Sequence, residues 1–215
     1  MVPKFSKREA ISFGWNLTKN NFGFFVLLLI LVAVIYVVLN SIQYLAKGKS
    51  PLILILYLIE TIIRTIITMG LIKISLKFCD NEKAKISDLF SAYPLFLKYL
   101  IGSILYALII LGGLILLIIP GIIWSIQFQF FGYLIVDKGL GPIEALKESA
   151  RITKGNKWNL FLFGILLGLI KILGALALLV GLFVTIPTAM IANAFVYRKL
   201  LSQTETLQET ETSSS

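Results

Sequence analysis

The stretch FGFFVLLLILVAVIYVVLNSIQYL, Phe22 to Leu45, decides the fold of this chain because it holds 24 residues without one charged side chain. An α-helix rises about 1.5 Å per residue, so roughly 20 apolar residues cross the ~30 Å hydrocarbon core of a bilayer. The run is longer than the hydrophobic part of a signal peptide, and no A-x-A cleavage motif follows it. We therefore expect a retained transmembrane helix here.

The rest of the chain has the same character. It is 58% hydrophobic and only 14% charged, whereas a soluble domain of 215 residues needs far more polar surface. Backbone groups in hydrocarbon must be hydrogen-bonded within their own segment, which requires α-helices. The sequence therefore predicts an all-α, polytopic membrane protein with six transmembrane helices, at residues 22–45, 51–72, 99–119, 121–136, 158–180 and 182–197.

Basic residues are distributed unevenly over the connections between these spans. The net charge is +9, yet the first, third and fifth connections hold only Lys47 and Lys49. The positive-inside rule then predicts a multi-pass protein of the cell membrane with both termini in the cytoplasm. Anionic lipid headgroups at the cytoplasmic face are the expected partners, at about 1 kcal/mol per nearby Lys or Arg, although topology signalling alone explains the pattern more simply. No nucleic-acid motif accompanies the basic charge.

Three segments ahead of long spans share a pattern. EAISFGWNLTKNN from Glu9 and EALKESARITKGN from Glu144 both read Glu-Ala-aliphatic, then aliphatic-Thr-Lys, then Asn. A weaker copy, DLFSAYPLFLK, begins at Asp88, and in all three an acidic residue precedes a lysine by ten positions. We expect one transmembrane domain, residues 1–201, built from three parallel hairpin repeats at about 6–77, 86–137 and 142–201. The Ser/Thr/Glu/Gln-rich segment 202–215 is expected to be a disordered cytoplasmic tail.

Each repeat is predicted to open with a cytoplasmic amphipathic elbow. At 100° per residue, the polar side chains of the segment 142–154 share one arc, and its apolar side chains occupy the other. Such a helix suits the headgroup layer of a membrane. Simple anchoring of the spans is the favoured interpretation, and lipid remodelling is the alternative.

Few charges interrupt the apolar runs. Glu60 and Arg64 are four positions apart on one helix face, and Lys171 is predicted to reach a depth similar to that of Glu60. A charge at a helix centre costs about 2.5–3.5 kcal/mol, so such residues usually face the bundle interior and find partners. We expect Glu60 to contact Arg64 or Lys171, unless Lys171 extends to the outer surface. The candidate intramembrane polar site comprises Glu60, Arg64, Lys171, Gln127, Gln129 and Asn193. These residues either hold helices together or line a polar path.

One region resembles a known family. It is Ile118–Phe161, with Pro120-Gly121, Tyr133 to Asp137, Gly141 to Leu146 and Thr153 to Gly155 as the matching pieces. This region is similar to uncharacterised prokaryotic six-helix integral membrane proteins, which are themselves similar to the membrane domain of some glycerophosphodiester phosphodiesterases. The resemblance implies a membrane module and brings no catalytic residues with it.

No catalytic constellation is visible in the sequence. The chain has no histidine, its acidic residues are scattered, and it lacks a P-loop, a G-x-S-x-G elbow and a dinucleotide fingerprint. We therefore expect no enzyme, no cofactor and no metal site. The first functional hypothesis is a non-enzymatic membrane protein that supports transport or export of a small or amphipathic solute. The alternative is a scaffold that organises lipids or a partner without transport. The substrate, the energy coupling, the oligomeric state and any protein partner stay open.

Overall fold

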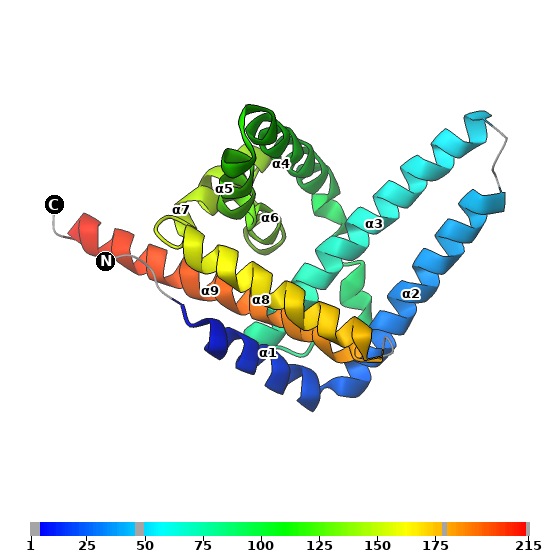
Figure 1. Cartoon of the computed structure of the whole chain (residues 1–215), viewed down its shortest axis with the longest axis horizontal. Helices are drawn as coiled ribbons and strands as arrows, with labels where there is room; N and C mark the ends of the chain where they lie inside the picture. The colour runs from blue at the N-terminus through cyan, green and yellow to red at the C-terminus, as the bar shows by residue number, and fades with distance from the viewer. Residues whose placement is uncertain (1–4, 46–49, 178–179, 214–215) are drawn as a thin grey trace.

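A computed structural model describes residues 5–45, 50–177 and 180–213, and every regular element in that part of the chain is helical. The order of elements is α1 (Lys7–Asn20), α2 (Phe22–Leu45), α3 (Ser50–Cys79), η1 (Ile86–Leu89), η2 (Tyr93–Leu95), α4 (Phe96–Leu116), α5 (Ile118–Phe128), α6 (Phe131–Lys138), α7 (Pro142–Ile152), α8 (Lys157–Leu176) and α9 (Leu182–Ser213) (Figure 1). The predicted all-α class is confirmed.

Five helical segments within the described residues are long and apolar enough to cross a membrane. They are Phe22–Tyr44, Ile53–Cys79, Ile86–Leu116, Ile118–Lys138 and Lys157–Leu176. Only a minority of their residues are buried within the protein, as expected when lipid is the solvent for the rest. They indicate a membrane protein. The sixth predicted span, residues 182–197, lies in α9 and is not among these five.

Helix α9 is the centre of the packing. It contacts α1, α2, α3, α7 and α8, and Ile191, Ala192, Ala194 and Tyr197 are fully buried in it. Small side chains let neighbouring helices approach closely. At Thr188 and Ala192 the neighbour is α1, whose Gly14 lies directly against the α9 backbone. The mixture of alanine, threonine and asparagine that makes this packing possible also lowers the hydropathy of α9.

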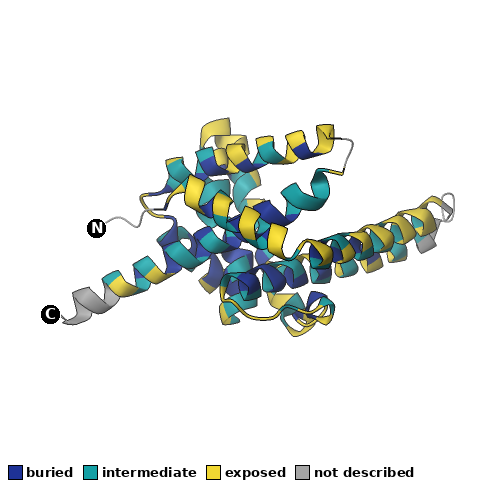
Figure 2. Ribbon diagram, turned by 90° about the horizontal axis from the view of Figure 1, so that it is seen from below, coloured by how far each residue is buried: buried dark blue, intermediate teal, exposed yellow. Residues whose placement is uncertain are grey.

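Two helical hairpins, α2–α3 and α4–α5, leave this centre in different directions, and the third, α8–α9, runs through it (Figure 1). The α2–α3 hairpin extends furthest from the rest of the molecule, and its surface is largely exposed, whereas buried residues gather around α9 (Figure 2). Leu27, Val37, Leu54 and Leu58 on this hairpin are each at least half exposed. Lipid is the natural solvent for such a surface.

The structure corrects several details of the sequence prediction. The fourth predicted span, 121–136, is not one helix but two, α5 and α6, separated at Gln129 and Phe130. The connection between the predicted spans 99–119 and 121–136, at Pro120, lies instead at Leu117, which has extended backbone, because proline fits the first turn of the following helix. The tail predicted as disordered is helical from 202 to Ser213. The first predicted connection, which holds Lys47 and Lys49, lies outside the described residues.

The three predicted elbows differ from one another. Residues 142–152 form the amphipathic helix α7 as expected, with Pro142 in its first turn. The first elbow forms α1, which packs lengthwise on α9. The middle elbow, around Asp88, forms the two short 3-10 helices η1 and η2 because Pro94 limits an α-helix there. The elbows therefore pack on the helical core as well as preceding the hairpins.

Candidate functional site

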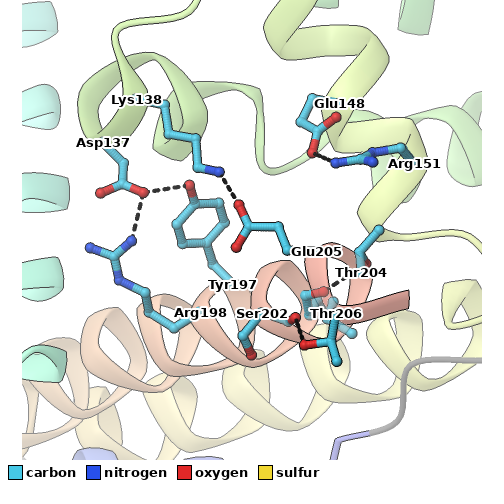
Figure 3. A network of polar contacts seen from close by, with 11 residues as sticks. Asp137, Lys138, Glu148, Arg151, Tyr197, Arg198, Ser202, Thr204, Glu205 and Thr206 are labelled. Atoms are coloured by element: carbon cyan, nitrogen blue, oxygen red, sulfur yellow. Dashed lines mark hydrogen bonds and ion pairs between the residues drawn. The ribbon is translucent and has the colours of Figure 1, made fainter. Parts of the chain in front are cut away.

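The candidate site is an ionic cluster where α3, α6 and α9 meet, and we call it the hub. It comprises Asp80, Asp137, Tyr197 and Arg198. The Arg198 guanidinium donates from Nε to Asp80 Oδ1 at 2.9 Å and from Nη2 to Asp80 Oδ2 at 2.6 Å. Its Nη1 donates to Asp137 Oδ2 at 2.6 Å, and the Tyr197 hydroxyl donates to the same oxygen at 2.8 Å (Figure 3). One arginine thus links the ends of two other helices to α9.

The two acidic residues need this arginine for a local reason. Asp80 directly follows the last residue of α3, and Asp137 is the last residue but one of α6. A negative charge at a helix C-terminus is repelled by the partial charges of the unpaired carbonyl groups. Arg198 neutralises both carboxylates, and its planar fork suits the bidentate contact with Asp80. Burial disfavours the charged guanidinium, but its hydrogen bonds to Asp137 and Asp80 outweigh this and hold the pKa of Arg198 above its ordinary value.

Further ion pairs surround the hub. Lys199 donates to Glu9 of α1 at 2.6 and 2.8 Å, and Lys138 of α6 pairs with Glu205 of α9 (Figure 3). Lys77 of α3 donates to both oxygens of Asp88 at 3.0 Å. The first two pairs join α9 to another element, and the third joins α3 to η1. Single exposed ion pairs contribute little, but a connected network with a half-buried arginine contributes more.

At the break between α5 and α6, side chains of α7 and of the residues directly after it bind backbone groups of the interrupted segment. The Ser149 hydroxyl accepts from the backbone N–H of Phe130 at 3.1 Å and donates to the carbonyl of Gln127 at 3.0 Å. The Thr153 hydroxyl also lies 3.0 Å from that carbonyl, and Lys157 donates to Oε1 of Gln127 at 2.5 Å. Irregular backbone in a membrane protein is tolerated where it is buried in protein. The buried face of α7 therefore supplies partners that lipid cannot.

The intramembrane charges predicted from the sequence are only partly brought together. Glu60 is buried and pairs with Arg64, so the predicted contact between them is confirmed. Gln43 of α2 also donates to Glu60, and the Arg64 guanidinium lies 4.6 Å from the centre of the Tyr36 ring. These residues join α2 to α3, beside a cavity of about 240 Å³ to which Gln43 also belongs.

The other predicted site residues lie elsewhere. Lys171 is exposed on α8 and forms no ion pair with the described residues, so the alternative contact with Glu60 does not form. Gln129, just after α5, donates to the carbonyl of Ile126, and Asn193 donates to the carbonyl of Ala189 one turn earlier in α9. Gln127 is held by α7 and α8, as described above. The described residues therefore give no single polar path through the candidate spans.

Sequence reasoning missed the hub. A signal for it was present, since two apolar runs are followed directly by an aspartate, in Cys79-Asp80 and Val136-Asp137, and the last apolar run ends in Tyr197-Arg198. Two aspartates and one arginine at the ends of three apolar runs form a cluster only if those ends meet in space, which the sequence alone does not show. Within the described residues, no group of three or more His, Cys, Asp or Glu side chains is arranged to hold a metal ion.

Comparison with known proteins places the chain in a family. Residues 89–211, from η1 through most of α9, match the family model described as a domain of unknown function, DUF7847. The chain belongs to this family. The DUF7847 match includes Asp137, Tyr197 and Arg198 of the hub but begins after Asp80 and Glu60.

Relatives of the chain occur in mycobacteria. An uncharacterized protein of Mycobacterium bovis and one of Mycobacterium tuberculosis CDC 1551 are each 30% identical over 131 residues, which is 61% of this chain and 40% of theirs. An uncharacterized protein of strain H37Rv is 29% identical over the same length. The chain thus spans less than half the length of the curated relatives it matches. No solved structure matches it significantly, and the comparisons show no link to glycerophosphodiester phosphodiesterases.

Proposed function

We propose that this chain is a non-enzymatic membrane scaffold, which holds three helical hairpins apart in the bilayer and thereby organises lipids or a partner protein. The observation that carries the proposal is the hub. Arg198 joins α9 to the ends of α3 and α6 through three charged hydrogen bonds, and the Tyr197 hydroxyl adds a fourth bond to Asp137. The α2–α3 and α4–α5 hairpins diverge from this centre (Figure 1), and their apolar side chains are largely exposed. An ion-paired centre from which hairpins diverge suits a protein that holds lipids or a partner protein in fixed positions.

The proposed topology is six spans with both termini in the cytoplasm. Five spans are the long apolar helices, and the sixth is residues 182–197 of α9. A span that is surrounded by protein needs less hydropathy than one that faces lipid, and α9 is the most enclosed of the long helices. The positive-inside distribution of Lys and Arg supports the orientation in the cell membrane.

The proposed threefold repeat has one structural support. Glu9, Asp88 and Glu144 each occupy the third position of the short helix that opens their segment. Asp88 accepts from the N–H of Lys85 at 2.7 Å, and Glu144 accepts from the N–H of Gly141 at 3.1 Å. An acidic side chain at this position satisfies a free backbone donor and favours the helix start. Asp88 and Glu144 thus share one local role, and Glu9 holds the same position while its carboxylate pairs with Lys199. The shared position in each segment is what a repeat predicts.

Transport of an amphipathic solute is the second candidate function. The interrupted helix α5–α6 favours it, since discontinuous helices form binding sites in many transporters. The dispersion of the predicted polar residues weighs against it, because Glu60, Lys171 and Gln127 do not share one path.

Extraction of the protein from its native membrane in lipid-retaining nanodiscs tests the two candidates together. Arg198→Gln loosens the hub, and Lys154→Gln, an exposed position, is the matched control. The scaffold proposal expects Arg198→Gln to reduce the lipid or partner protein retained per chain, with insertion unchanged. Solute flux through reconstituted vesicles is measured in parallel. If Arg198→Gln or Glu60→Gln lowers flux while retention is unchanged, the scaffold proposal is wrong and transport is supported.

A further inference from the structure

We propose that a groove between α1 and α8 binds one anionic phospholipid, with its phosphate at Lys7 and Arg8 and one acyl chain along the two helices. The inference rests on the proposed role as a lipid-organising scaffold and adds the site and the class of lipid. The groove has a volume of about 860 Å³, within the range of pockets that enclose small ligands.

The groove forms because α1 and α8 both pack against α9. Gly14 lets the α1 backbone rest on α9 at Thr188, which lies on the floor of the groove. Phe5 closes the space between the two helices at one end through an edge-to-face contact with Phe163, with ring centres 5.6 Å apart. Beyond this contact, α1 and α8 contribute facing walls.

The residues that line the groove change from polar to apolar along its length. Lys7, Arg8 and Asn159 lie at the end near Phe5, where both helices begin. Further along, the lining is apolar, with Ile11 and Trp15 on α1 and Leu166 and Ile170 on α8. A phospholipid has the same order of a charged headgroup followed by hydrocarbon. The polarity of the groove therefore matches one lipid molecule in one orientation.

The length of the groove fits one leaflet. From Asn159 to Ile170, α8 rises about 16 Å, roughly half of the ~30 Å hydrocarbon core. Because α8 is a candidate span that starts at Lys157, its first turn is at the membrane interface. A lipid whose headgroup reaches Lys7 and Arg8 then stays at its normal depth.

The two basic side chains are available for a phosphate. Neither Lys7 nor Arg8 forms an ion pair or a side-chain hydrogen bond with the described residues. Glu9, the one acidic residue of α1, is held by Lys199 on α9. The charge of Lys7 and Arg8 is thus not neutralised on their own helix, and arginine matches phosphate oxygens geometrically. Zwitterionic lipids gain less from the same two charges.

The test measures thermal stabilisation of the full chain in detergent by short-chain phosphatidylglycerol, with short-chain phosphatidylcholine as the comparison. A ligand that binds only the folded state raises the melting temperature, and at a given ligand concentration it does so more strongly the tighter it binds. We expect phosphatidylglycerol to stabilise the protein more strongly. Lys7→Gln/Arg8→Gln should lower its affinity by roughly 30-fold, the effect of removing two basic groups that face an anionic headgroup.

Matched variants separate the groove from general charge and hydrophobicity. Lys19→Gln/Lys154→Gln removes two exposed charges outside the groove and should leave the affinity unchanged. Leu166→Trp fills the groove and should abolish the stabilisation, whereas Leu169→Trp, on the same helix but not in the lining, should not. Equal stabilisation by both lipids, or equal binding by Leu166→Trp and Leu169→Trp, overturns the inference. The Arg198→Gln retention experiment is independent of these outcomes and decides the scaffold proposal separately.

Discussion

Gly14 in α1 lies against the backbone carbonyl of Thr188 in α9, so closely that a Cβ atom at position 14 would be 2.4 Å from the carbonyl oxygen. Backbone atoms cannot move aside as the end of a side chain can, so only glycine fits between the two helices here. The contact fixes α1 on α9 rather than leaving it free at the membrane surface, and it brings Glu9 within reach of Lys199.

Gly14→Val should therefore detach α1 from α9. We expect a large loss of stability, because burial of Ala10 and Thr18 on the same face depends on this approach. The measurement is the melting temperature of the purified protein in detergent. Gly164→Val on α8 is the control, since a Cβ there meets no described atom within 4 Å. Equal melting temperatures for the two variants would contradict the close α1–α9 packing.

Arg198→Ala should destabilise the chain by about 3 kcal/mol, because it leaves the half-buried Asp137 carboxylate without its cation. Asp137→Asn in the same background should recover part of the loss, since it removes the unpaired charge. Unfolding in detergent with increasing denaturant measures both changes. If the double variant is no more stable than Arg198→Ala alone, the two residues are not energetically coupled in the way the geometry requires.

The sequence predicted the parts of the fold that depend on local pattern. Uncharged runs such as Phe22–Leu45 predicted membrane helices, and the i, i+4 spacing predicted the Glu60–Arg64 pair, because helix geometry alone determines both. The hub could not be derived in this way. Asp80 and Arg198 are 118 residues apart, and their contact depends on how three hairpins meet. Similarly, nothing local in residues 121–136 indicated a break, because its backbone partners come from Ser149 on α7 and from Thr153 directly after it.

Ser149→Ala should destabilise the chain by about 1–3 kcal/mol, because it leaves the N–H of Phe130 buried without an acceptor. The matched control is Ser103→Ala, whose hydroxyl donates only to the carbonyl of Tyr99 one turn earlier in α4. We expect that control to change stability by less than about 0.5 kcal/mol. Hydrogen exchange at Phe130 provides a second measurement, and it should accelerate only in the Ser149 variant. Unchanged protection there would mean that α7 does not stabilise the helix break.

Substitution of the three intramembrane charges should give unequal effects. Arg64→Leu leaves the Glu60 carboxylate buried with Gln43 as its main partner, so we expect a loss of about 1–3 kcal/mol. Lys171→Leu should be neutral or slightly stabilising, because this side chain is exposed on α8 and forms no ion pair with the described residues. Glu60→Gln should fall between these two, since a neutral amide keeps the contact with Gln43 and removes the buried charge. Melting temperatures in detergent and the inserted fraction in membranes measure all three variants. If Lys171→Leu is as damaging as Arg64→Leu, Lys171 must have an ionic partner that the described contacts do not show. In that case the pairing of Glu60 with Arg64 within the α2–α3 hairpin is not sufficient to neutralise the intramembrane charges.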